Sequence, residues 1–126
     1  MQRIKINANN KKRMMTGKHL IADVINITNY EILNTIEDIQ PLLQKIITDM
    51  NLNVVGEVHH QFQPVGATCL YLLSESHLSI HTYPELRYLT MDLYCCNNNI
   101  NMDDVLEIIY NFFNHDCIIK KFVINR

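Results

Sequence analysis

Residues 72–85 read LLSESHLSIHTYPE and crowd serines, histidines, a glutamate and a threonine between two hydrophobic runs. Polar side chains inside a core strand carry a desolvation cost, so we expect a function that offsets it. The runs on either side predict strands, which places this stretch inside or beside the sheet of the fold.

The 126 residues suffice for one hydrophobic core, so we expect a single domain over residues 1–126. Hydrophobic residues make up 48% of the chain and charged residues 19%, which is typical of a soluble globular protein. A net charge of -2 argues against nucleic acid or a membrane surface as a partner. Lys11, Lys12, Arg13 and Lys18 cluster near the start, and we expect them to form a solvated arm.

The sequence shows neither the apolar core of a signal peptide nor the ~20 apolar residues that span a bilayer. We therefore expect a cytoplasmic protein whose cysteines, Cys69, Cys95, Cys96 and Cys117, are free thiols. Because side chains alternate along a strand, at most one of the adjacent Cys95 and Cys96 faces a given site.

Alternating and apolar runs predict strands, which we place at residues 17–27, 53–62, 66–73, 87–96 and 117–125. After the first strand, Thr28 and Glu31 have capping-box spacing, and apolar residues from Ile32 to Met50 recur at the helical period. Pro41 falls inside that pattern, so we expect it to kink or break the helix.

A second helix is predicted near the end of the chain. Asn97, Asn98 and Asn99 favour a turn, and Asn101 is suited to cap the helix that follows. One face of this helix is apolar and consists of Met102, Val105, Leu106, Ile109, Phe112 and Phe113.

The order of these elements favours an α+β fold, a two-layer α/β sandwich with a mostly antiparallel sheet and two helices on one face. Each helix has a single apolar stripe, so both should cover the same face of the sheet. The other face is then left for another partner.

Two other kinds of chemistry fit the residues less well. His77 and His81 on one strand lie ~13 Å apart, and neither C-x-x-C nor H-E-x-x-H is present, so we predict no metal site. A serine hydrolase would need Ser76 in a motif such as G-x-S-x-G, which is absent. A strand edge without chemistry stays the alternative for each polar residue taken singly.

Taken together, the polar residues form a motif that resembles the motif of a known family. The motif E-S-H-x-S-I-H-T-x-P-E at 75–85 is similar to the self-processing motif of the small prokaryotic-type S-adenosylmethionine decarboxylases, pyruvoyl-dependent enzymes of polyamine synthesis. The resemblance extends from G-K-H-L-I-A at 17–22 through F-x-P-x-G at 62–66 to D-L-Y-C-C at 92–96. It implies an enzyme that converts S-adenosylmethionine to decarboxylated S-adenosylmethionine, the aminopropyl donor for spermidine.

The resemblance also implies self-cleavage between Glu75 and Ser76 into chains 1–75 and 76–126. In the family the serine hydroxyl attacks the preceding carbonyl, and the resulting ester is eliminated with release of the glutamate carboxylate. Hydrolysis of the dehydroalanine that remains releases ammonia and leaves a pyruvoyl group at the new N-terminus. His81 and Thr68 match the residues that assist this processing, His81 by handling the elimination proton. The family more often has serine at the position of Thr68.

The pyruvoyl ketone of the family forms a Schiff base with the substrate amine and serves as an electron sink. Cys96, and not Cys95, matches the cysteine that returns a proton to carbon, and an ordinary thiol is mostly protonated at neutral pH. The implied substrate-binding residues are Phe62, Leu73, Glu75, Tyr83 and Glu85.

Four positions near these residues depart from the family pattern. Tyr83 stands where tryptophan is common, Leu86-Arg87 where an aromatic and a glycine are frequent, and Asn97 where glycine follows the cysteine. Arginine or ornithine therefore stays open as the substrate of a pyruvoyl-dependent decarboxylase of the same fold. An unprocessed, non-catalytic dimeric homologue is a further alternative, and no extra segment for activation by putrescine is evident.

An extended strand sets the distance between Ser76 and His81. Five steps of ~3.3 Å put them ~16 Å apart, too far to cooperate within one chain. A twofold axis would bring one copy's His81 near the other copy's Ser76, and the family is dimeric with shared sites. We expect a homodimer in which one subunit supplies Glu75, Ser76 and Cys96 and the other supplies Phe62, Thr68, His81, Tyr83 and Glu85.

Overall fold

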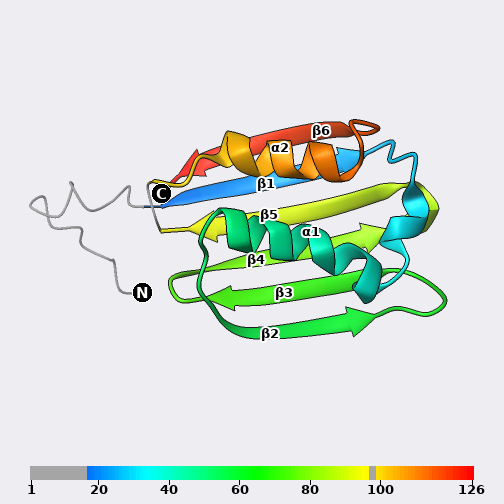
Figure 1. The fold of residues 1–126 in the computed structure, drawn as a ribbon, viewed down its shortest axis with the longest axis horizontal. Helices are drawn as coiled ribbons and strands as arrows, with labels where there is room; N and C mark the ends of the chain where they lie inside the picture. The colour runs from blue at the N-terminus through cyan, green and yellow to red at the C-terminus, as the bar shows by residue number, and fades with distance from the viewer. Residues whose placement is uncertain (1–16, 97–98) are drawn as a thin grey trace, which may run out of the picture.

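Six strands form one antiparallel sheet, and two helices cover one of its faces (Figure 1). The computed structural model describes residues 17–96 and 99–126. The strands are β1 (Lys18–Ile25), β2 (Val54–Gln61), β3 (Ala67–Leu73), β4 (Ser76–Tyr83), β5 (Tyr88–Cys95) and β6 (Ile118–Asn125), and the helices are α1 (Ile36–Asp49) and α2 (Met102–Phe112). This architecture confirms the predicted α+β sandwich with both helices on the same face.

The sheet order is β2-β3-β4-β5-β1-β6, so β1 lies between β5 and β6 although it comes first in the chain. All five neighbouring pairs are antiparallel. The stretch 72–85, which the sequence left without a defined element, contains the strand β4 at the centre of this sheet. Its polar residues are tolerated because only every second side chain of β4 is buried.

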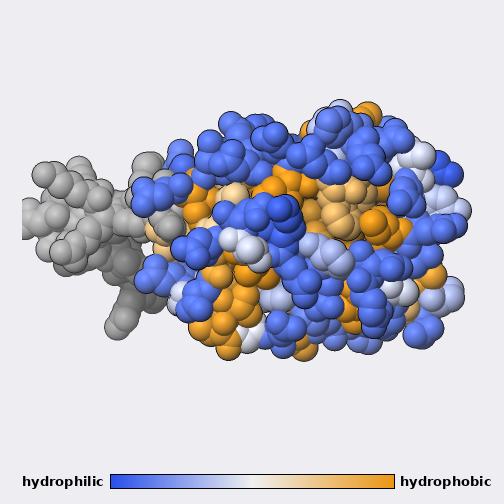
Figure 2. Space-filling model, in the orientation of Figure 1, coloured by the Kyte–Doolittle hydropathy of each residue, from blue (hydrophilic) through white to orange (hydrophobic). Residues whose placement is uncertain are grey.

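The core lies between the sheet and the helices. Leu78 and Ile80 of β4 are fully buried, as are Leu89 and Leu93 of β5. On α2 the buried residues include Val105 and Ile109, as the apolar pattern predicted. Burying each such side chain contributes about 2 kcal/mol to folding. Hydrophilic residues cover most of the outer side of the helix layer (Figure 2).

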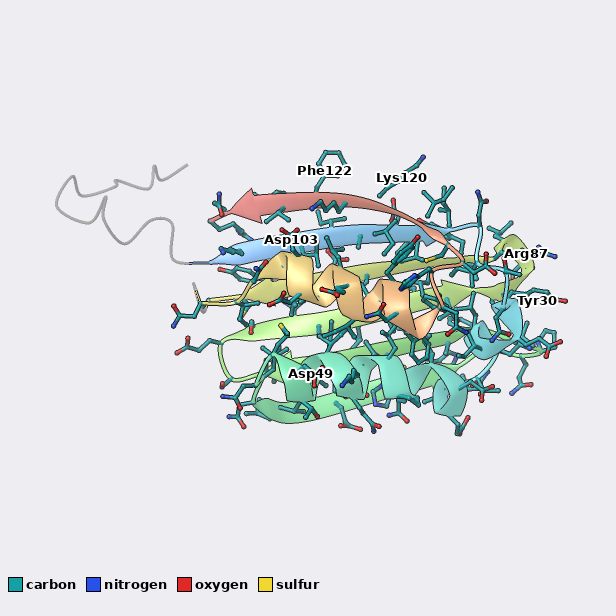
Figure 3. The ribbon with its side chains drawn as sticks, turned by 45° about the horizontal axis from the view of Figure 1, so that its top comes forward. Tyr30, Asp49, Arg87, Asp103, Lys120 and Phe122 are labelled. Carbon is teal, nitrogen blue, oxygen red and sulfur yellow. The ribbon has the colours of Figure 1, made fainter. Side chains whose placement is uncertain are left out.

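The face of the sheet away from the helices is uncovered and carries large apolar side chains. Phe122 is 72% exposed and projects from β6 on this side, as does the neighbouring Lys120 (Figure 3). Strand alternation and exposure place further apolar residues on the same open face, namely Val58, Leu70, Leu72, Ile118 and Ile124. The open face therefore combines exposed apolar side chains on its outer strands with polar residues such as Ser79 and His81 on the central strand β4.

The N-terminus of α1 differs from the prediction. The helix begins at Ile36, capped by Thr35, whose hydroxyl accepts from the backbone N–H of Asp38 at 3.2 Å. Thr28 and Glu31 are not its capping box, because a separate 3-10 turn occupies Tyr30–Leu33. The apolar periodicity ran across both elements and concealed the break between them.

Pro41 does not break α1, which continues to Asp49. A proline inside a helix removes one N–H from the backbone ladder. Pro41 is exposed, so water can bind the carbonyl that is left without a donor. The prediction of a break was wrong for this reason.

The second helix begins as predicted, with the Asn101 side chain accepting from the N–H of Asp103 at 2.9 Å. Lys18 does not belong to a solvated arm, since it opens β1 and its ammonium donates to the carbonyl of Ile100 at 3.2 Å. The rest of that basic cluster, and two of the three asparagines in the predicted turn, lie outside the described residues. Within the described ranges no helix is long and apolar enough to cross a membrane.

Cys69 is one of the buried core residues, as expected for a small apolar side chain. Burial, and then the charge of Glu57, raise the pKa of its thiol from 9.0 to about 11. The folded chain therefore holds this proton more tightly than the unfolded chain does.

We expect the free energy of unfolding to fall as the pH rises from about 9 to about 11, because over that range unfolding releases the Cys69 proton. Below pH 9 both states keep the proton, so Cys69 adds no pH dependence there. Urea titrations of the chain and of Cys69→Ala, both carrying Ser76→Ala to keep the backbone intact, measure the difference. The slope against pH should be shallower in Cys69→Ala, and parallel curves would contradict the assignment.

Candidate functional site

The bond between Glu75 and Ser76 lies at a tight turn between two central strands. Leu73, the last residue of β3, pairs with Ser76, the first of β4, so that only Ser74 and Glu75 form the connection. The N–H of Ser74 donates to the carbonyl of Asn53 at 3.0 Å, which ties the turn to the loop before β2. The register of the two strands thus holds the Glu75–Ser76 peptide in a fixed place.

A thiol lies against this peptide. The Sγ of Cys96 donates to the carbonyl oxygen of Glu75 at 3.0 Å. Cys96 comes directly after β5 and is half-buried, whereas Cys95 is only 4% exposed and belongs to the core. The two adjacent cysteines therefore face different environments, as strand alternation predicted.

A depression of about 190 Å³ surrounds the turn and is lined by residues 51–53, 73–76, 95 and 96. It brings together a hydroxyl from Ser76, a backbone carbonyl from Glu75 and a thiol from Cys96. Leu73 lies in its wall and is almost fully buried. A nucleophile, a carbonyl and a hydrogen-bond donor are the groups that an acyl shift at this peptide requires.

Thr68 and His81 form a second group, on the open face of the sheet. The two residues are paired across β3 and β4, and the Thr68 hydroxyl is hydrogen-bonded to Nδ1 of His81 at 2.9 Å. Nε2 of His81 has no hydrogen-bond partner among the described residues. The contact at Nδ1 orients the ring and leaves Nε2 available for proton transfer.

Phe62, Tyr83 and Glu85 line a third region, a depression of about 500 Å³ beside the loop that joins β2 to β3. Phe62 is 47% exposed and Tyr83 is 38% exposed, so neither ring is an ordinary core residue. Tyr83 stacks on Tyr88 with ring centroids 5.4 Å apart. Two exposed aromatic rings and a carboxylate suit a ligand with a planar ring and hydroxyl groups.

Gly66 closes the loop of this depression with a φ of +110°, a conformation that favours glycine. The loop is also held by Gln61, which the sequence did not single out. Gln61 accepts from the N–H of Ile36 at 2.8 Å and donates to the carbonyls of Asn34 and Gly66, each at 2.9 Å. One side chain thus fastens the start of α1 to the loop that presents Phe62.

Thr82 is a second support that the sequence analysis missed. Its hydroxyl accepts from the N–H of Ala67 at 2.8 Å and donates to the carbonyl of Leu33 at 2.8 Å. Thr82 is 5% exposed, so these contacts satisfy a polar group that burial would otherwise penalise. Its place in the motif, with alternation putting it on the buried side of β4, was the available signal.

The structure does not bring all the predicted site residues together within one chain. Glu75, Ser76 and Cys96 meet at one end of β4, whereas Tyr83 is the last residue at its other end and Glu85 follows two residues later. By strand alternation Ser76 points to the same side of β4 as the buried Leu78, whereas His81 points to the open side. Ser76 and His81 are therefore separated by both distance and direction.

Arg87, next to the third region, has a φ of +52° and lies in the left-handed conformation. This explains why glycine suits the position, since a left-handed residue with a side chain is strained. Arg87 gains a compensating contact, because its guanidinium carbon lies 5.0 Å from the centroid of the Tyr30 ring. Figure 3 shows the two side chains at the same end of the molecule.

We expect Arg87→Gly to be more stable than Arg87→Ala by about 1 kcal/mol, because both lose the contact with Tyr30 and only glycine relieves the backbone strain. Urea unfolding of the two variants measures the difference. Equal stabilities would show that the left-handed conformation is not strained in the folded chain.

Comparison with known proteins gives a consistent result. The model of the S-adenosylmethionine decarboxylase family matches residues 18–125. The S-adenosylmethionine decarboxylase proenzyme of Aquifex aeolicus is 40% identical over 105 residues, which are 83% of this chain and 77% of that protein. The proenzyme of Picrophilus torridus is 34% identical over 97 residues, 77% of this chain and 74% of its own length. The crystal structure of the adenosylmethionine decarboxylase from Aquifex aeolicus superimposes with a TM-score of 0.79 at 33% identity, covering 89% of this chain and 91% of that one.

Proposed function

The chain belongs to the S-adenosylmethionine decarboxylase family, and on that premise we propose that it cleaves itself between Glu75 and Ser76 and that Ser76 becomes its pyruvoyl group. The chain is an adenosylmethionine decarboxylase, a carboxy-lyase that acts on S-adenosylmethionine. Its relatives are named for this substrate, which favours S-adenosylmethionine over arginine and ornithine. They are also named proenzymes, which supports processing of the chain.

The contact between Cys96 Sγ and the Glu75 carbonyl oxygen at 3.0 Å carries this proposal. When the Ser76 hydroxyl adds to the carbonyl carbon, negative charge builds on that oxygen, and a donor already in place stabilises it. The C–N bond then breaks, leaving an ester between Glu75 and Ser76 and a free amine on Ser76. Cys96 is positioned to act before cleavage as well as during decarboxylation.

The residues around the turn fit a pyruvoyl group derived from Ser76. The depression of about 190 Å³ lies directly at this residue, and Cys96 lines it. A pyruvoyl group would supply a ketone that binds the substrate amine. It would also accept the electron pair that stays on the substrate carbon when carbon dioxide leaves. Cys96 then donates the proton on Sγ to the substrate carbon, leaving a thiolate that regains a proton from solvent.

We expect Ser76→Ala to remain a single 14.8 kDa chain, because it lacks the hydroxyl that attacks the carbonyl. Cys96→Ala should cleave more slowly, on the order of tenfold, since it loses one donor to the carbonyl oxygen and a thiol is a weak donor. Intact-mass spectrometry of the freshly folded chains follows both reactions.

Ser74→Ala is the matched control for these variants, because Ser74 lies in the same turn and offers a hydroxyl on the other side of Glu75. It should yield the same two fragments as the unaltered chain, with a pyruvoyl group on the fragment that begins at residue 76. An unaltered chain that stays at 14.8 kDa would contradict self-processing.

The open face supports the further proposal of a homodimer with shared sites. Its exposed apolar residues lie toward both edges of the sheet, on β2 and β3 at one edge and on β6 at the other, and exposed apolar patches mark interaction sites. A twofold axis close to Ser79 would bring the Ser76 end of β4 near the Tyr83 end of the partner's strand, because Ser79 lies between them. In this arrangement Thr68, His81, Phe62, Tyr83 and Glu85 of one subunit complete the site around Glu75, Ser76 and Cys96 of the other.

The order of the processing steps is also consistent with a site built from residues of two subunits. Attack by Ser76 on its own carbonyl is local and needs no partner. The later elimination needs a base at the Cα hydrogen of Ser76, and His81 of the same chain faces away on the open side. We propose that the partner subunit's His81 removes this proton.

We expect a Ser76→Ala chain and a His81→Ala chain, co-expressed, to yield some fully processed sites. The His81→Ala chain has the serine, and the Ser76→Ala chain supplies the histidine across the interface. Mass spectrometry of isolated mixed dimers should find the pyruvoyl fragment derived from the His81→Ala chain.

Two controls limit the interpretation of this experiment. A chain with both substitutions, mixed with itself, should form no pyruvoyl. Ser79→Asp, which places two like charges beside the proposed axis, should weaken the dimer in sedimentation analysis, whereas Thr48→Asp on the exposed side of α1 should not. Verified mixed dimers without any pyruvoyl fragment would rule out the shared site.

A further inference from the structure

Tyr94 lies beside the thiol of Cys96. It lies on β5 two residues before Cys96, so the two side chains point to the same face of the sheet. The Tyr94 hydroxyl is 3.8 Å from Cys96 Sγ, which donates toward it. Among the described residues, Tyr94 and the Glu75 carbonyl are the two hydrogen-bond partners of this sulfur.

The Tyr94 ring is held in place by residues from both ends of the described fold. Gly17 leaves no room beside it, since a Cβ built on Gly17 would lie 2.7 Å from Cε1 of Tyr94. The guanidinium carbon of Arg126 lies 4.9 Å from the ring centroid. Gly17 and Arg126 are themselves joined by two backbone hydrogen bonds of 2.8 Å, so they form one rigid unit against the ring.

His19 and His77 pack against the remaining sides of the ring, each with a centroid distance of 5.9 Å. His19 is fixed in turn by Asp92, whose carboxylate lies 2.8 Å from Nε2. Tyr94 is half-buried, has these four residues as neighbours and presents its hydroxyl to Cys96. The neighbours limit the orientations that the ring can adopt.

We propose that Tyr94 is the positioning residue that aims the Cys96 thiol, first at the Glu75 carbonyl and, after cleavage, at the substrate carbon. This inference rests on the proposed self-processing at Glu75–Ser76. Cleavage converts the Glu75 carbonyl into part of a free carboxylate, which is no longer tied to Ser76. The Tyr94 hydroxyl comes from β5, which Cys96 directly follows, and it is the partner that the cut leaves unchanged.

The contact also suits both protonation states of the thiol. The hydroxyl accepts from the S–H group, and it can donate to the thiolate once the proton has moved to carbon. The hydrogen bond with Cys96 is the first cause that raises the pKa of Tyr94 above its ordinary value, because the neutral hydroxyl can donate to the sulfur and the phenolate cannot. Loss of this hydroxyl would leave Cys96 with the Glu75 carbonyl as its partner before cleavage. After cleavage the Cys96 side chain would be free to rotate away from the substrate.

Tyr94→Phe tests the inference because it keeps the aromatic ring and removes only the hydroxyl. We expect an unchanged melting temperature, cleavage of the freshly folded chain slowed several-fold, and a several-fold lower kcat with an unchanged KM. We expect kcat to fall and KM to stay unchanged because Tyr94 is proposed to contact the thiol and not the substrate. Tyr110→Phe, on the exposed side of α2, is the matched control and should behave like the unaltered chain.

Gly17→Ala provides a second route to the same contact, since its methyl group would displace the Tyr94 ring without altering the hydroxyl. It should slow cleavage as Tyr94→Phe does. The double variant should be little slower than the slower single variant, because both changes remove one interaction. Fully additive losses would contradict a common path through Tyr94.

Different experimental results would contradict the role of Tyr94 and the proposed self-processing. An unaltered chain that does not cleave overturns self-processing at Glu75–Ser76. An unaltered chain that cleaves, together with Tyr94→Phe that matches it in cleavage rate and kcat, overturns the role of Tyr94. A Tyr94→Phe variant that raises KM and leaves kcat unchanged overturns it as well, since that result would indicate substrate binding.

Discussion

The antiparallel register between β3 and β4 is the constraint on which the other features depend. With Leu73 opposite Ser76, the connection shrinks to Ser74 and Glu75, and the same register sets Thr68 opposite His81. A slip of one residue would turn every side chain of β4 to the other face, burying His81 and exposing Ile80. The fully buried Leu78 and Ile80 oppose such a slip, so core packing fixes where the Glu75–Ser76 peptide lies.

Local patterns predicted those parts of the fold that depend on neighbours in sequence. The Asn101 cap, the apolar stripe of α2 and the opposite orientations of Cys95 and Cys96 all follow from helix or strand periodicity. Contacts between distant residues were not predictable in this way. Gln61 binds the N–H of Ile36 across 25 positions and Thr82 binds the carbonyl of Leu33 across 49, and no short pattern records either pairing. Thr35 likewise caps α1 instead of Thr28 because the preceding turn intervenes.

The sequence of the motif at 75–85 indicated the chemistry of its residues more clearly than their secondary structure. Its polar residues alternate with Leu78, Ile80 and Thr82, which gives a strand with one buried and one open face. The resemblance to the family implied roles for Ser76, His81 and Cys96, but it did not give the distances between them. The structure adds that the Cys96 thiol reaches the Glu75 carbonyl within the chain, while His81 faces away from Ser76.

The position of β1 in the sheet determines how easily the two fragments of a cleaved chain could separate. A cut after Glu75 leaves β1, β2 and β3 on one fragment and β4, β5 and β6 on the other, yet β1 lies between β5 and β6. The fragments interlock through three strand pairings and cannot separate without dismantling the sheet. Folding of the intact chain is a first-order process, whereas reassembly from fragments would be second-order and dependent on concentration. Cleavage therefore makes the fold hard to regain once lost, so its lifetime is governed by the unfolding barrier.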